Sequence, residues 1–178
     1  MQTWKTLNKS ALLSFGKWLT VERHTVALPD GQIIDDWPWI ITPDYVNVVA
    51  FTPQDKILCF RQVKYALEGE TLATVGGYIE PGEDPLTAAR RELLEETGYT
   101  APEWIFLGRY AVDANRGAGV GHFFLARNAV PVTGPNADDL EEQELILLDR
   151  SLVAAALKDG QFKALAWTAI LALALLHE

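Results

Sequence analysis

The stretch GGYIEPGEDPLTAARRELLEETGY, residues 76–99, carries the signals that decide the fold. Asp84 can cap the start of a helix, and Pro85 suits the first helical position because its fixed φ matches a helix and it lacks an N–H to satisfy. Gly98 can take the left-handed conformation that ends a helix. The stretch therefore predicts a helix over residues 84–97, entered from a glycine-rich loop.

Three glutamates, Glu92, Glu95 and Glu96, fall on one side of this helix, next to an apolar stripe. Acidic groups in a last helical turn oppose the helix dipole, at a cost of about 0.3 to 1 kcal/mol each. Arg91 and Glu95 form an i, i+4 pair in the less favourable order, so Arg91 offsets this charge only in part. A divalent cation, Mg²⁺ or Mn²⁺, would compensate, since both prefer hard oxygen ligands. The alternative is a solvated acidic face.

The composition sets the class of protein. The chain has 178 residues, 49% of them hydrophobic, which is enough for one well-filled core. Its formal charge of −9 argues against sequence-independent binding of nucleic acid. The one cysteine, Cys59, lies in an apolar run and fits a buried thiol in a reducing compartment, so we expect a cytoplasmic location.

The most apolar segment is ALAWTAILALALL, residues 164–176. Its 13 residues are fewer than the roughly 20 that span a bilayer, so we expect no membrane association. The segment is typical of a buried helix or of a dimer surface.

Strands are expected on both sides of the helix, with a turn at residues 28–31. β-Branched and apolar runs predict strands over residues 18–28, 32–41, 45–51, 56–63, 104–112, 121–127 and 145–149. The runs 45–51 and 56–63, separated by TPQD, indicate a hairpin, and two helices should follow from about Arg150. This order predicts an α/β or α+β fold, an α/β/α layer sandwich.

The helix and its loop together resemble the Nudix box. The matching residues are Gly77, Glu83, Arg91, Glu92, Leu93, Glu95, Glu96 and Gly98. Tyr99 alone departs, because it stands where the family has an aliphatic residue. The resemblance implies a Nudix-type sandwich with a mixed sheet over residues 45–178. It also implies an added antiparallel β segment over residues 1–44 that serves dimerisation, and hence a homodimer.

The resemblance further implies metal-dependent hydrolysis of a nucleoside diphosphate linked to another group, X. The implied metal ligands are Glu92, Glu95, Glu96 and the Gly76 carbonyl, with Glu95 as a ligand or a catalytic, water-orienting residue. Arg91 would pair with Glu83 and shape the loop, with a direct catalytic role as the alternative. A non-catalytic module that senses a nucleotide sugar is the rival interpretation.

The chain is most similar to ADP-ribose pyrophosphatases, which implies that the substrate is an NDP-sugar such as ADP-ribose. The family's proline after the box is missing near Arg116, and Ala73 stands where a glutamate is common. The family places a general base on a loop after the box, where Glu142 is our choice among Glu141, Glu142 and Glu144. The candidate substrate-binding residues, each with a structural role as the alternative, are Arg61, Gln62, Arg116 and Trp39.

Overall fold

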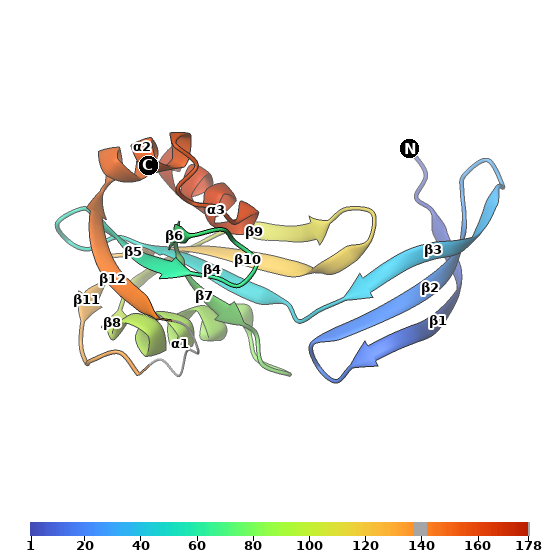
Figure 1. Cartoon of the computed structure of the whole chain (residues 1–178), viewed down its shortest axis with the longest axis horizontal. Coiled ribbons are helices and arrows are strands. Elements are labelled where there is room, and N and C mark those ends of the chain that lie inside the picture. Colours follow the sequence, from blue (N-terminus) through green and yellow to red (C-terminus); the bar gives the residue numbers. More distant parts are fainter. Residues whose placement is uncertain (137–141, 178) are drawn as a thin grey trace. The chain divides into compact units, whose positions relative to one another are not determined.

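The computed structural model describes residues 1–136 and 142–177, and the chain divides into two compact units (Figure 1). The first unit contains Met1–Asp44 and Tyr110–Gly121, and the second contains Tyr45–Arg109 and His122–Glu178. Strands β9 (Glu103–Asp113) and β10 (Gly117–Arg127) contribute residues to both units.

The first unit is an antiparallel meander of three strands. These are β1 (Lys5–Phe15), β2 (Leu19–Ala27) and β3 (Ile33–Ile41). The predicted turn joins β2 to β3, with the Gly31 N–H donating to the Leu28 carbonyl at 3.0 Å. β1 is not among the strands expected from the sequence. Its alternation of apolar and polar residues is weak, and nearly all of its residues are exposed.

The second unit is an α/β/α sandwich, which confirms the predicted fold class. In one of its sheets, β4 lies between β7 and β10, and β9 pairs with β10. The other sheet has the strand order β12, β5, β6. The strands not yet given are β4 (Tyr45–Ala50), β5 (Lys56–Val63), β6 (Glu70–Ala73), β7 (Val75–Tyr78), β8 (Tyr99–Thr100), β11 (Val130–Pro131) and β12 (Gln143–Asp149). Helix α1 (Pro85–Thr97) lies on one side of this unit, and α2 (Arg150–Lys158) and α3 (Leu165–Leu176) lie on the other (Figure 1).

The predicted hairpin of residues 45–51 and 56–63 is wrong, although both strands exist. β4 pairs with β7, and β5 pairs with β6 and β12, so the two strands lie in different sheets. At the turn between them, an isolated bridge joins Phe51 and Ile57. Both strands are buried on both faces over most of their length, so each lies in the interior of the fold. Their pairing partners come from other parts of the chain.

Alternate residues of β5 face two separate hydrophobic cores. Leu58 and Phe60 pack in the core that includes α1, whereas Ile57 and Cys59 pack in the core that includes α2 and α3. Burial raises the pKa of the Cys59 thiol to about 12, so this thiol stays protonated near neutral pH.

Helix α1 begins and ends where its signals predict. The Asp84 side chain accepts hydrogen bonds from the N–H groups of Leu86 and Thr87, at 3.1 Å each, and Pro85 is the first helical residue. Gly98 is left-handed, with φ 74°, and its N–H donates to the Leu94 carbonyl. These local contacts fix the ends of the helix that carries the three glutamates.

The apolar segment 164–176 forms helix α3. Its residues Ile170, Leu171 and Ala174 are buried, while Leu165 and Leu176 are exposed. Of the helices that the structure describes, none is both long enough and apolar enough to cross a membrane.

Candidate active site

Two of the three glutamates of α1 contact the glycines of β7. The Gly76 N–H donates to Oε2 of Glu96 at 3.0 Å. A Cβ on Gly77 would lie 2.2 Å from Oε1 of Glu92, so the carboxylate of Glu92 occupies the space that a side chain would need. Gly76 and Gly77 therefore belong to a strand, not to the expected loop, and they let the helix carboxylates approach its backbone.

Arg91 links the helix to the loop that precedes it. Its Nε and Nη2 donate to the two carboxylate oxygens of Glu83, both at 2.9 Å, which confirms the expected ion pair. Nη1 donates to Glu92 at 2.7 Å and to Glu95 at 3.1 Å, and Nη2 donates to the Tyr78 carbonyl. Arg91 thus contacts two of the three carboxylates, and its single positive charge offsets their charge in part, as expected.

Burial and Arg91 set the protonation of the nearby carboxyl groups. The hydrogen bond from Arg91 holds the pKa of Glu83 below its usual value. The pKa of Glu92 is raised, mainly because this residue is only 9% exposed and its carboxyl group is shielded from water. The charge of Arg91 opposes this shift. The pKa of the Arg91 guanidinium is raised chiefly by Glu83, so Arg91 stays charged.

The residues of this site suit a divalent cation by their chemistry. Glu92, Glu95 and Glu96 supply carboxylate oxygens from one helix face, and the Glu92 carboxylate fits against Gly77, which has no side chain. Within residues 1–136 and 142–177, no three His, Cys, Asp or Glu side chains stand together as a ready metal cage. Arg91 donates hydrogen bonds to the carboxylates of Glu92 and Glu95, so a bound cation would bind carboxylates that also contact Arg91.

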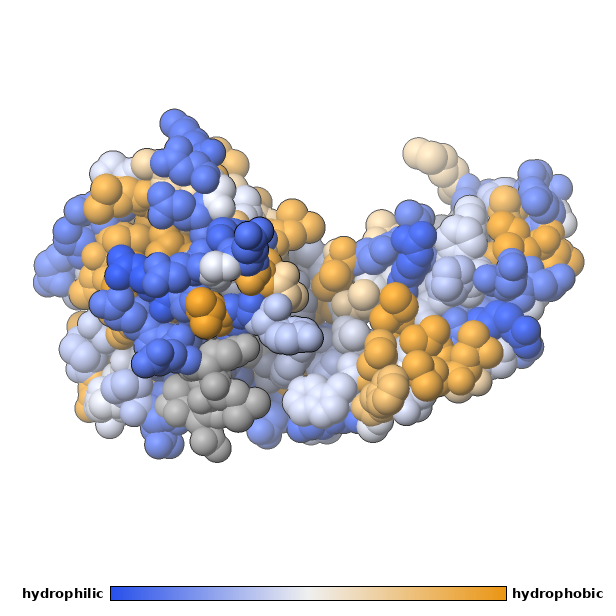
Figure 2. Space-filling model, in the orientation of Figure 1, coloured by the Kyte–Doolittle hydropathy of each residue, from blue (hydrophilic) through white to orange (hydrophobic). Residues whose placement is uncertain are grey.

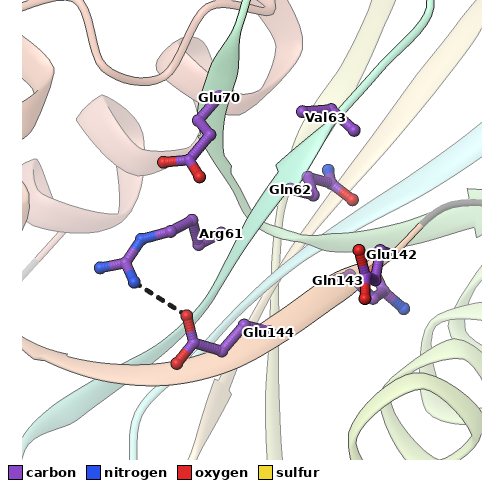
Figure 3. Close-up of a pocket in the computed structure, with 7 residues that line it drawn as sticks. All are labelled: Arg61, Gln62, Val63, Glu70, Glu142, Gln143 and Glu144. Carbon is purple, nitrogen blue, oxygen red and sulfur yellow. Dashed lines mark hydrogen bonds and ion pairs between the residues drawn. The ribbon is translucent and has the colours of Figure 1, made fainter.

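A cavity of about 310 Å³ lies at the carboxyl-terminal end of β5 and is lined by Arg61, Gln62 and Glu142 (Figure 3). The other lining residues are Val63, Glu70, Gln143 and Glu144. Arg61 is exposed, and its Nη1 donates to Oε2 of Glu144 at 2.8 Å, whereas Gln62 is buried. The structure thus brings together two of the predicted substrate-binding residues and the predicted base.

Asn136, which follows β11 in sequence, contacts α1. The Asn136 N–H donates to the Glu95 carbonyl at 2.8 Å. Glu141 lies outside the described residues. Sequence reasoning did not single out Glu70 or Gln143 as lining the cavity. Gln143 lies opposite Gln62 in the register of β12 and β5, a pairing that the sequence does not show.

Arg116 and Trp39 belong to the first unit, where they are neighbours. The Ile40 N–H donates to the Arg116 carbonyl at 2.8 Å, and the Arg116 side chain pairs with Asp113 at 3.3 Å. The Trp39 ring stacks on His24, with centroids 5.4 Å apart. A Cβ on Gly117 would lie 2.8 Å from the Trp39 ring, so the tight turn at Gly117 accommodates this tryptophan.

Comparison with protein families and known proteins gives matches along the chain. Residues 42–168 match the model of the NUDIX domain, and residues 4–40 match that of a nucleoside diphosphate sugar hydrolase N-terminal domain. A methanol dehydrogenase activator of Bacillus methanolicus is 30% identical over 80% of this chain and 75% of its own length. An ADP-ribose pyrophosphatase of Bacillus subtilis is 30% identical over 86% of this chain and 81% of its own length.

A solved structure shows the same fold. The crystal structure of an ADP compounds hydrolase superposes with a TM-score of 0.83, covering 99% of this chain and 95% of that chain at 21% sequence identity. The NUDIX match covers well over half of the chain and includes α1, its glutamates and Arg91. The chain therefore belongs to the Nudix family and is a Nudix pyrophosphohydrolase.

Proposed function

We propose that this protein hydrolyses the pyrophosphate bond of a nucleoside diphosphate linked to another group, X, in a divalent-metal-dependent reaction. The observation that carries the proposal is the set of Glu92, Glu95 and Glu96 on one helix face, with Glu92 and Glu96 against the glycines of β7. Water attacks one phosphorus, the bridging P–O bond breaks, and a nucleoside monophosphate and a phosphorylated X group leave. Water is the only co-reactant.

The cation is Mg²⁺ or Mn²⁺ in this proposal, with Glu92 and Glu96 as its principal ligands. Glu95 is a further ligand or orients the water, and the Gly76 carbonyl is a backbone ligand. When bound, such a cation neutralises the diphosphate and lowers the pKa of the attacking water. A cation beside Glu92 would offset the desolvation that raises the pKa of this carboxyl, in the same direction as Arg91.

Arg91 is a positioning residue in this proposal, because its guanidinium binds Glu83 and its Nη1 donates to Glu92 and Glu95 and so orients them. A direct catalytic role remains the alternative interpretation of its contact with two site carboxylates. Glu142, which lines the cavity, is the proposed general base.

The proposed substrate is an NDP-sugar such as ADP-ribose. Support comes from the relative named ADP-ribose pyrophosphatase and from the match to a nucleoside diphosphate sugar hydrolase N-terminal domain. Arg61 and Gln62, which line the cavity, are proposed substrate-binding residues. Arg116 and Trp39 stay proposed substrate-binding residues on the basis of the sequence alone.

The test is hydrolysis of a panel of substrates with Mg²⁺ or Mn²⁺ and after chelation of the metal. The panel contains ADP-ribose, other nucleotide sugars, dinucleotides and nucleoside triphosphates. Cleavage of nucleotide sugars to the monophosphate, lost on chelation and restored by the metal, is the expected result. Tight binding of ADP-ribose without cleavage of any compound would instead favour a nucleotide-sugar sensor.

Oligomerisation through residues 1–44 is also proposed, with a second copy of this chain as the partner. Apolar side chains gather on the surface of the first unit (Figure 2). The exposed apolar residues of β1 and of its turn are Leu7, Leu12, Leu13, Phe15 and Trp18. Exposed apolar patches of this kind mark interaction surfaces.

We predict that sedimentation at micromolar concentration gives about twice the 19.7 kDa mass of one chain. The substitution Leu12→Glu should shift the protein toward monomer, because it places a charge in the apolar surface. Leu152→Glu on the exposed side of α2 is the matched control and should leave the dimer intact. A wild-type protein that sediments as a monomer would refute the dimer.

A buried thiol suits a reducing compartment, and we propose a cytoplasmic location on that basis. Cys59 is fully buried in the core and has no cysteine partner, since the sequence contains a single cysteine.

A further inference from the structure

The two neighbouring cavity residues of β5 face opposite sides of their sheet. Side chains alternate along a strand, and on β5 Phe60 belongs to the core of α1 while Cys59 belongs to the core of α2 and α3. Continuing this alternation places Gln62 on the side of α1, which carries the glutamates. Arg61 then lies on the side of α2 and α3.

Arg61 is already engaged on its own side. It stands opposite Glu144 in the strand register and donates to that carboxylate at 2.8 Å. Figure 3 shows this pair on one side of the strands, joined by a dashed line, with Gln62 and Gln143 on the other side. The arginine therefore does not share the face of α1, although it lines the same cavity.

Gln62 is a buried amide that faces the cavity. The residue is 6% exposed and lines the cavity, and its side chain makes no hydrogen bond to another residue in the described ranges 1–136 and 142–177. Gln143 stands opposite Gln62 in the antiparallel register, so a second amide flanks the first. A ligand that enters the cavity can therefore hydrogen-bond the Gln62 amide.

We propose that Gln62 is a specificity-determining residue that hydrogen-bonds a hydroxyl group of X, an inference that rests on the proposed function. An amide accepts through its oxygen and donates through its nitrogen, which suits the hydroxyl of a sugar. Among the residues that line the cavity, the single cation, Arg61, lies on the other side, and Glu142 adds negative charge beside Gln143 (Figure 3). The X group in this cavity is therefore an uncharged, hydroxyl-bearing sugar and carries no further phosphate.

The test compares ADP-ribose with analogues in which one hydroxyl of the terminal ribose is replaced by hydrogen, and with ADP-ribose bearing a phosphate on that ribose. Wild-type protein should lose roughly 10-fold in kcat/KM for at least one deoxy analogue, because the amide loses its partner. The phosphorylated analogue should be cleaved more slowly than ADP-ribose. The variant Gln62→Leu should cleave ADP-ribose and that deoxy analogue at nearly equal kcat/KM.

The ratio between the two substrates is the decisive readout, since a merely structural role of Gln62 would lower both values together. Gln54→Leu, the same chemical change in the exposed turn before β5, is the matched control and should keep the wild-type ratio. Equal cleavage of all deoxy analogues by wild-type protein overturns the inference even if Gln62→Leu fails to fold. Failure of wild-type protein to cleave any nucleotide sugar would instead refute the proposed function.

Discussion

Replacing Glu96 by Gln is expected to lower kcat on the order of 10²- to 10⁴-fold, while the protein stays folded. A catalytic metal contributes several kcal/mol to the transition state, and each 1.36 kcal/mol is a factor of ten in rate. Gln keeps the shape of Glu and an oxygen that can accept the hydrogen bond from the Gly76 N–H, now 3.0 Å from the carboxylate. It loses the negative charge that the proposed metal site needs.

Two measurements separate a metal ligand from a structural residue. Binding of Mn²⁺ alone, measured by calorimetry, should weaken in Glu96→Gln, and the free energy of unfolding without metal should change little. Glu103→Gln, at an exposed residue whose carboxylate lies 4.0 Å from Arg127, is the control and should keep wild-type rates. Wild-type kcat and Mn²⁺ affinity in Glu96→Gln would remove Glu96 from the site.

The helix of the site could be predicted from sequence because its signals are local. Asp84, Pro85 and Gly98 act within one turn of the chain, so no knowledge of the rest of the fold was required. The strands of residues 45–50 and 56–63 were likewise visible as apolar, β-branched runs. Their pairing was not visible, since it depends on burial on both faces and on partners as distant as β12.

The site itself was predicted less completely, because its contacts join distant segments. The glycines at 76 and 77 indicate a loop by composition, yet they form a strand against β4. Arg91 also contacts Glu92, its neighbour in sequence, because the guanidinium that binds Glu83 also reaches the Glu92 carboxylate. Spacing rules for helix surfaces treat adjacent residues as not facing one another, so they miss this contact.

Gly77→Ala is expected to lower kcat on the order of 10²-fold with little loss of stability. The added Cβ would lie 2.2 to 2.4 Å from the carboxylate atoms of Glu92, which must then move. This carboxylate is the end of a flexible side chain, so the fold can yield at small cost. A catalytic group misplaced by about 1 Å can cost 10²-fold in rate. Steady-state kinetics and thermal unfolding, measured on the same preparation, test both halves of the prediction.

The neighbouring glycine supplies the control, because the same methyl group would meet different atoms there. A Cβ on Gly76 would lie 2.4 Å from the Val46 carbonyl oxygen and 3.2 Å from the Asn47 Cα, both on the buried strand β4. Backbone cannot rotate away as a carboxylate can, so Gly76→Ala should lower the free energy of unfolding by about 1 to 3 kcal/mol. If Gly77→Ala instead unfolds at lower temperature than Gly76→Ala and keeps wild-type kcat, then Glu92 holds the fold together and takes no part in the chemistry. The opposite pattern, with stability lost at Gly76 and rate lost at Gly77, would place the Glu92 carboxylate in the catalytic site and β7 in its support.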